Sequence, residues 1–296
     1  MKQKTTPARF PLRRQLAGLY GYELTSCIDI TTAVWVALLA ARGYSLWQIG
    51  LAEGVHHIVS LAAEIPSGMA ADLLGRRRTL AASGLMAALS GLLMAFEQGF
   101  GFVLASMALS ALSYNLISGT FEALSYDSLC AAGRTELYPT VQTRCALLQS
   151  VGSILGHLAS LLTAVLPFRA YYLIDVGLSG LRSLAAGSLR EPVVTETQAA
   201  REAAETRALL ATLPRRLRTH VRETVRFLLG SPATTRLIFA NAVISLPCYL
   251  TLMFLQQRLS AAGLPTALLG LIVCLFELGR PVGSWLSLRV RPRRLV

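Results

Sequence analysis

The sequence is poor in charge, and acidic residues are fewer than basic ones. Charged residues make up 15% of the chain, against about 25% in typical soluble domains. Hydrophobic residues make up 53%. So little charge beside so much apolar surface is typical of a protein that lies in a lipid bilayer.

The sequence also lacks the motifs of several chemical classes. Its five cysteines lie apart in apolar stretches, without the C-x-x-C or Cys/His spacing of a zinc site and without the pattern of a disulfide framework. It has no glycine-rich P-loop, which argues against an ATP-driven pump. It has no Ser/His/Asp or metal-binding constellation either. We therefore expect no cofactor, no metal and no enzymatic activity.

The net charge of +12 raises the possibility of nucleic-acid binding. The basic residues, however, lie in loops between apolar segments rather than in a stripe beside aromatic side chains. This distribution favours a membrane protein whose basic loops stay on the cytoplasmic side, and no nucleic-acid partner.

Eight apolar segments come close to the ~20 residues that a helix needs to cross a bilayer. They are residues 16–41, 48–71, 79–96, 101–124, 140–166, 171–189, 237–255 and 266–288. We therefore expect an all-α membrane protein built as a helical bundle of about eight transmembrane helices.

The basic residues also predict the orientation of these helices. Most of them fall in alternate loops, and the loops between contain Arg42, Arg169 and Arg258. With the basic loops inside, both termini are cytoplasmic, and residues 1–15 form a retained cytoplasmic tail. The predicted location is the plasma (inner) membrane.

Residues 190–236 form a polar linker that divides six predicted spans (16–189) from two (237–296). After a charged helical pattern at 196–212, an amphipathic helix follows Pro214. Its apolar stripe is Leu217, Val221, Val225 and Leu228, and its other faces carry arginines. We expect this linker helix to lie on the anionic inner leaflet of the lipid bilayer. The alternative is a regulatory or partner-binding helix.

The most informative segment is the short turn between the second and third spans. It contains Gly68, Asp72, Gly75, Arg76 and Arg77 in the spacing Gly-x3-Asp-x2-Gly-Arg-Arg. Glycine allows the helix ends to turn sharply, and the arginines place the turn in the cytoplasm. The spacing resembles the loop between the second and third helices of the major facilitator superfamily of transporters.

The resemblance implies a fold of twelve helices in two six-helix halves, of which this chain contains the first eight, truncated after the eighth. It also implies that the turn acts as a cytoplasmic latch, with Asp72 as the latch acid. Leu73 stands where the family usually has a basic residue. Asp127, at another cytoplasmic helix end, is a candidate partner for the arginines.

Residues 118–129 resemble the fourth helix of bacterial drug-resistance-like members of the family. At Asn115, many proton-coupled antiporters of the family have an arginine instead. The resemblance therefore supports a transporter of this kind without implying a proton-coupled drug antiporter.

Polar and ionisable residues inside a span are costly, and they are functional candidates for that reason. The candidates for a substrate or proton pathway are Thr25, Asp29 and Thr32 on one face of the first span, Glu53 and His57 in the second, and Asn115 and Glu122 in the fourth. We expect them to line a polar cavity, although pairing between helices is the structural alternative. For Glu23, Glu64 and Asp175, near predicted helix ends, an interfacial or structural role is favoured.

These features together predict secondary active transport of a small molecule by alternating access. Efflux driven by a proton or ion gradient is the favoured form. The alternative is a truncated fragment that cannot transport, or a membrane partner subunit that does not transport.

Overall fold

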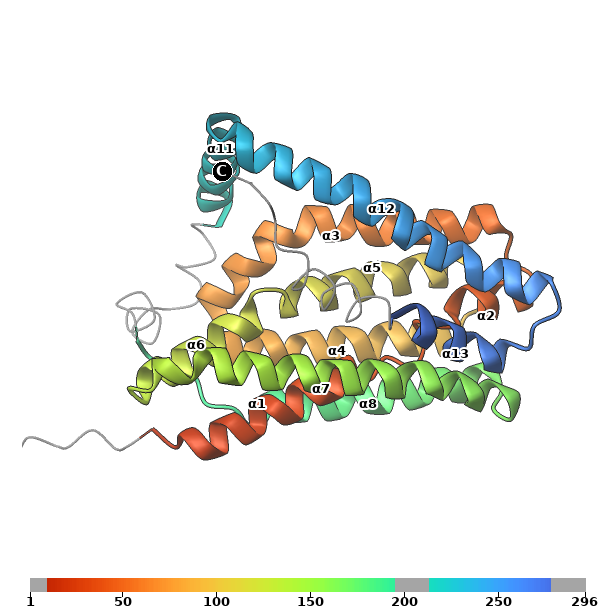
Figure 1. The fold of residues 1–296 in the computed structure, drawn as a ribbon, viewed down its shortest axis with the longest axis horizontal. Helices are drawn as coiled ribbons and strands as arrows, with labels where there is room; N and C mark the ends of the chain where they lie inside the picture. Colours follow the sequence, from red (N-terminus) through yellow and green to blue (C-terminus); the bar gives the residue numbers. More distant parts are fainter. Residues whose placement is uncertain (1–9, 195–212, 278–296) are drawn as a thin grey trace, which may run out of the picture.

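The computed structural model describes residues 10–194 and 213–277, and within these ranges the chain forms helices and no strand (Figure 1). The all-α class predicted from the sequence is therefore confirmed. The helices are α1 Leu12–Cys27, α2 Trp35–Ala41, α3 Leu46–Leu74, α4 Arg76–Ala95, α5 Phe100–Ile117, α6 Thr120–Ala131, η1 Thr135–Leu137, α7 Tyr138–Leu158, η2 Ala159–Ala164, α8 Phe168–Ser188, α11 Leu213–Gly230, α12 Pro232–Ala261 and α13 Thr266–Glu277.

The long helices run side by side along the long axis of the molecule (Figure 1). Helix α4 packs against both α5 and α8, α3 packs on α5, and α1 packs on α7 and α8. From the later part of the chain, α12 contacts α2, and α13 packs on α7 and η2. The two parts of the chain therefore share one bundle.

Four helical stretches in the described part of the chain are long and apolar enough to cross a membrane. They are Arg76–Ala95, Phe100–Ala131, Thr135–Ala164 and Pro232–Ala261. The expected count of eight and the division at 190–236 stay predictions. The predicted tail 1–15, the charged pattern 196–212 and the eighth span 266–288 all lie wholly or partly outside the described residues.

The first predicted span is not one helix, which corrects the expectation for residues 16–41. Helix α1 ends at Cys27 and α2 begins at Trp35, so residues 28–34 form an unwound segment. There Asp29 Oδ1 accepts hydrogen bonds from the backbone N–H groups of Thr31 (2.9 Å) and Thr32 (3.1 Å). An aspartate that bonds nearby backbone donors offers the chain a turn in place of a helix. Thr25 and Thr32 therefore do not share a helical face with Asp29.

The fourth predicted span, 101–124, is also interrupted. Gly119 lies between α5 and α6 with φ of +71°, in the left-handed region that glycine adopts without strain. The bend lets α6 leave the direction of α5 and carry Glu122 and Asp127 to the end of the bundle where α3 joins α4.

Two glycines on α7 allow that helix to pack directly on α1 and the unwound segment. A Cβ atom added at Gly152 would lie 2.8 Å from Cys27 Cβ, and one at Gly156 would lie 2.5 Å from the Asp29 carbonyl oxygen. Real Cβ atoms essentially never come so close to other heavy atoms. The Gly-x3-Gly spacing therefore marks a backbone contact, as such spacings do between membrane helices.

The turn between α3 and α4 is tied to the end of the six-helix part. Gly75 has φ of +101°, and directly after it the backbone N–H groups of Arg76 and Arg77 donate to the Glu191 carboxylate (2.9 and 2.8 Å). A carboxylate at a helix N-terminus satisfies free donors and complements the helix dipole. The start of the predicted linker is thereby fixed to the start of α4.

Apolar side chains pack at both ends of the bundle. One cluster includes Leu19, Leu80 and Leu189 near the α3–α4 turn. Another includes Val36 and Val103 at the opposite end. Between these clusters the polar side chains described next face one another.

Candidate functional site

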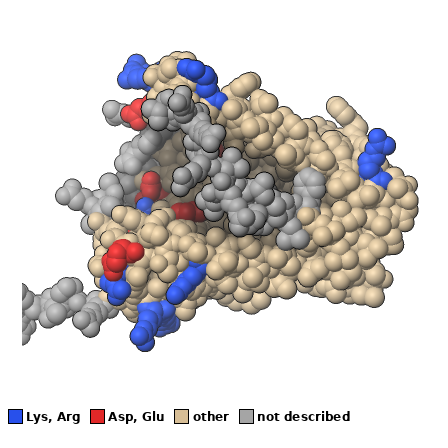
Figure 2. Space-filling view, viewed as in Figure 1, with Lys and Arg blue, Asp and Glu red and all other residues tan. Residues whose placement is uncertain are grey.

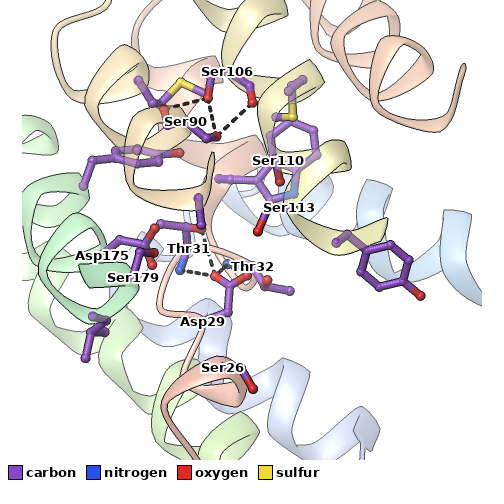
Figure 3. Close-up of a pocket in the computed structure, with 18 of the residues that line it drawn as sticks. Ser26, Asp29, Thr31, Thr32, Ser90, Ser106, Ser110, Ser113, Asp175 and Ser179 are labelled. Carbon is purple, nitrogen blue, oxygen red and sulfur yellow. Dashed lines mark hydrogen bonds between the residues drawn. The ribbon is translucent and has the colours of Figure 1, made fainter. Parts of the chain in front are cut away.

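A cavity of about 360 Å³ lies inside the bundle, and we call it the central cavity (Figure 3). Its walls come from the end of α1, the unwound segment, α3, α4, α5, α8 and α12. Hydroxyl groups are its commonest polar lining: Thr25, Ser26, Thr31, Thr32, Ser90, Ser106, Ser110, Ser113 and Ser179. Such a lining can bind a polar ligand by donating and accepting hydrogen bonds.

Three carboxylates from three separate elements line the central cavity. Asp29 comes from the unwound segment, Glu53 from α3 and Asp175 from α8. In Figure 3, Asp175 and Ser179 project from α8 toward the segment that carries Asp29. The charges of Asp29 and Asp175 lie close enough to interact. This part of the cavity is therefore suited to a positively charged group or a proton.

Arg182 is the positive counterpart on the same wall. Its side chain is buried, and Nη2 donates to Ser113 Oγ (3.2 Å) and to the Ser83 carbonyl (3.5 Å). Arg182 makes no ion pair within 4 Å in the described part of the chain, and its Nε has no hydrogen-bond partner there. Its charge acts on Asp175, two turns earlier on α8. The guanidinium therefore offsets part of the acidic charge of the cavity without neutralising any one carboxylate by contact.

Ser90 and Ser106 hold two walls of the cavity together. Their Oγ atoms lie 3.0 Å apart, and each also donates to the other residue's carbonyl oxygen, at 2.8 and 2.9 Å. These reciprocal bonds fix α4 to α5. The two hydroxyls therefore hold α4 and α5 in place, and they are not available to bind a ligand.

The structure brings four of the predicted pathway residues together at the cavity: Thr25, Asp29, Thr32 and Glu53. His57 lies beside them, with Nε2 3.1 Å from Glu53 Oε1. Their role in transport stays a prediction.

Asn115 and Glu122 do not line the central cavity. Asn115 is buried between α3 and α5, where it accepts from Ser60 Oγ (2.7 Å) and donates to Glu64 Oε2 (3.2 Å). Glu122 is exposed on the first turn of α6. Through this bond Glu64 of α3 contacts α5, and its interfacial or structural role stays a prediction.

The sequence interpretation missed Asp175, Arg182 and His56 as cavity residues. Asp175, Ser179 and Arg182 follow the i, i+4, i+7 spacing of one helix face, and that spacing was the signal that could have shown a polar stripe on the sixth span. His56 gave no such signal, because it lies beside the stripe of Glu53 and His57 rather than on it.

The predicted latch residues lie in different environments. The Arg76 guanidinium forms an ion pair with Asp127 and donates to the Ala123 carbonyl (2.8 Å), so α4 is joined to α6. Arg77 donates to the Gly187 carbonyl. Asp72 is exposed and makes no hydrogen bond or ion pair with the residues that the structure describes. The latch function of Gly68, Asp72, Gly75, Arg76 and Arg77 stays a prediction.

A bundle of apolar helices around a polar cavity is the architecture of a multi-pass membrane protein. The chain belongs to the Major Facilitator Superfamily, whose family model matches residues 24–296. The resemblance seen in the turn at 68–80 is thereby confirmed.

Two relatives, both from Bacillus subtilis (strain 168), are similar to parts of the chain. The uncharacterized MFS-type transporter YxaM is 34% identical over 95 residues, which is 32% of this chain and 24% of that protein. The uncharacterized MFS-type transporter YdeG is 32% identical over 138 residues, which is 43% of this chain and 32% of that protein. The chain thus covers about a quarter and a third of these relatives. No solved structure matches it significantly. The relatives are named as transporters, in agreement with the expectation that the chain is not an enzyme.

Proposed function

We propose that the chain transports a small molecule across the plasma membrane by alternating access, as an exporter driven by a proton or ion gradient. The central cavity is the binding site. The observation that carries this proposal is that Asp29, Glu53 and Asp175, each from a different element, line one cavity inside the bundle. Secondary transporters bind substrate and coupling ion near the midplane, at interrupted helices, and the unwound segment is such an interruption.

The chemistry of the cavity favours a substrate with a positive charge. Asp29 and Asp175 provide negative charge at one wall, and hydroxyls of Thr25 and Thr32 provide hydrogen bonds beside them. A proton bound at either carboxylate competes with a cationic substrate for the same negative charge. Exchange of one for the other makes the energy of the gradient available for export.

Transport by the chain is expected to depend on these two carboxylates. The assay uses everted membrane vesicles from a bacterial host without its own drug exporters. Vesicles that contain the chain should accumulate the cationic dye ethidium when the membrane is energised. Asp29→Asn and Asp175→Asn should each lower the rate about tenfold or more, because each removes a charge-assisted contact. Glu136→Gln, at an exposed position in the short helix η1, is the matched control and should transport normally.

Two outcomes of that assay contradict the proposal in different ways. If the chain moves no ethidium above the empty-vector level, the proposed export of this class of compound is wrong. If both aspartate variants transport like the parent chain, export stands but the assignment of the central cavity as its site is wrong.

We further propose that the end of the bundle at the α3–α4 turn faces the cytoplasm, with both termini on that side. Figure 2 shows basic side chains gathered at this end of the visible face, with fewer at the opposite end. Helix α11 lies at the same end and contacts α3 and α12. It exposes Arg218, Arg222 and Arg226 beside the apolar side chains of Val225 and Phe227, as expected of a helix at the surface of an anionic leaflet.

Anionic lipid is therefore expected to protect α11 from trypsin, which cleaves after arginine. Cleavage at Arg218, Arg222 and Arg226, measured by mass spectrometry, should be several-fold slower in liposomes with phosphatidylglycerol than in liposomes of phosphatidylcholine alone. Arg134, exposed between α6 and η1, provides the internal control and should be cleaved equally in both. Equal cleavage of α11 in the two lipids would instead favour the alternative of a partner-binding helix.

A further inference from the structure

Asp175 and Arg182 present opposite charges to the central cavity from one face of α8. They are seven residues apart, so their Cα atoms lie about 10 Å apart along the helix axis. The two side chains form no ion pair within 4 Å in the part of the chain that the structure describes. Asp175 also makes no hydrogen bond with the described residues. The two charges therefore face the cavity with a gap between them.

Hydrogen bonding between helices does not account for the charge of Arg182. A single nitrogen, Nη2, makes both of its bonds, and the two acceptors, Ser113 Oγ and the Ser83 carbonyl, are neutral. A glutamine side chain would suffice for such bonds. Nε is buried without a partner among the described residues. A buried charge is costly unless it is paired and its donors are satisfied, so the guanidinium retains a charge and a free donor for a ligand.

A carboxylate is the ligand group that suits this guanidinium. Arginine binds carboxylates through two parallel N–H···O bonds in a fixed plane. The Ser113 hydroxyl donates to the Ser83 carbonyl (2.8 Å) and accepts from Arg182 Nη2 (3.2 Å), so the guanidinium is oriented before a ligand arrives. Among the described residues that line the cavity there is no other arginine and no lysine. Arg182 is therefore the place where an anionic group of a ligand would bind.

We propose that the substrate of the central cavity is a zwitterion, whose carboxylate binds Arg182 and whose ammonium group binds Asp175 and Asp29. In Figure 3, Asp175 and Ser179 project from α8 toward the segment that carries Asp29. Ser179 lies between Asp175 and Arg182 on the same helix face and provides a hydroxyl for the middle of the ligand. The inference rests on the proposed function, because it takes the central cavity as the substrate site and adds an anionic group to the positive charge of the substrate.

The test compares the affinity of three small aromatic compounds for the full chain in nanodiscs, measured by isothermal titration calorimetry. 4-(Aminomethyl)benzoate carries both charges at opposite ends of a benzene ring. Its methyl ester keeps the ammonium group alone, and 4-methylbenzoate keeps the carboxylate alone. The zwitterion should bind about tenfold or more tightly than either of the others, because it makes charge-assisted contacts at both ends. Equal affinities for the zwitterion and its ester would overturn the proposal.

Two substitutions assign the two ends of the ligand. Arg182→Gln should lower the affinity for the zwitterion to about that of the ester, and it should not weaken binding of the ester. Asp175→Asn should lower the affinity for the zwitterion to about that of 4-methylbenzoate for the parent chain. Arg182→Lys keeps the charge without the planar fork, so it should give an intermediate affinity, and it carries the test if Arg182→Gln does not fold. An equal loss of zwitterion and ester binding in these arginine variants would mean that Arg182 only shapes the cavity, and the proposal would be wrong.

Arg169→Gln is the matched control. Arg169 also lies on α8, but its guanidinium stacks over the Phe96 ring, 4.5 Å from the centroid, and it does not line the central cavity. The substitution removes the same charge from the same helix. It should leave the affinities for all three compounds unchanged.

A free anion such as chloride could supply the same negative charge to Arg182. Titrations are therefore repeated at constant ionic strength with chloride replaced by a bulky organic sulfonate. The affinity for the ester should not change. An ester that binds more tightly as chloride is added would assign the anion to chloride and contradict a carboxylate on the substrate.

The outcomes separate this inference from the proposed function. A chain that binds the zwitterion through both charges but accumulates no ethidium would refute the proposed export alone. A chain that exports ethidium but does not prefer the zwitterion would refute this inference alone.

Discussion

Gly156→Leu is expected to leave no folded protein in the membrane. The Cβ atom alone would lie 2.5 Å from the Asp29 carbonyl oxygen and 3.0 Å from the Asp29 backbone nitrogen. Backbone cannot yield as a flexible side chain does, so α7 must move away from the unwound segment. Overpacking a well-packed contact costs about 1–3 kcal/mol per site, out of a total stability of about 5–15 kcal/mol. The leucine side chain adds to this by separating α7 from α1.

The measurement is the yield of monodisperse protein and its midpoint of thermal unfolding in detergent. Gly156→Ala should give an intermediate result, with a lowered midpoint. Gly177→Leu is the control, because Gly177 lies in α8 and a Cβ there would have no neighbour within 4 Å. A Gly156→Leu chain with the yield and midpoint of the parent would show that α7 does not pack on the backbone at Asp29.

The sequence has a Gly-x3-Gly spacing at Gly152 and Gly156 that allows a close contact of α7, but it leaves the nature of the partner open. Gly-x3-Gly spacing indicates a close approach without naming the partner, and the partner proved to be an interrupted helix. The interruption itself escaped because residues 16–41 form one continuous apolar segment. The local signal was Asp29 followed by Thr31 and Thr32, an aspartate able to bond the backbone donors just after it.

The sequence predicted some residues of the candidate site and missed others. Asp29 and Glu53 were predicted as site residues because a carboxylate inside a span is energetically costly and is therefore a functional candidate. That argument does not say which face of a helix points at which neighbour. Asn115 therefore seemed equivalent to Glu53, although its partners Ser60 and Glu64 close it off. Asp175 was assigned to a helix end, because its depth depends on how α8 lies in the bundle.

The unwound segment links these two results. The Asp29 carboxylate accepts a hydrogen bond from a backbone N–H of this segment, which is therefore not helical. The Asp29 carbonyl oxygen packs against α7 at Gly156. The Asp29 carboxylate is held by the backbone N–H groups of Thr31 and Thr32 and by the Thr31 hydroxyl (2.9 Å).

Arg76→Ala is expected to destabilise the bundle by about 3 kcal/mol or more, whereas Arg134→Ala should cost less than about 1 kcal/mol. Both arginines pair with a carboxylate. The Arg76 and Asp127 side chains are 17% and 10% exposed, but those of Arg134 and Glu136 are 53% and 60% exposed. Solvent screens the exposed pair of Arg134 and Glu136.

The comparison is made by thermal unfolding in detergent, followed with a thiol-reactive dye that reports exposure of the buried Cys145 in chains whose other four cysteines are replaced by serine. Arg76→Lys should fall between Arg76→Ala and the parent, since a lysine keeps the charge near Asp127 but cannot hold both Asp127 and the Ala123 carbonyl in the planar geometry of a guanidinium. Equal midpoints for Arg76→Ala and Arg134→Ala would mean that the joint between α4 and α6 does not stabilise the fold. If the midpoints separate as expected, the main role of Arg76, in the turn at 68–80, is to join α4 to α6 within the six-helix part. Any movement of the latch must then leave that bond intact.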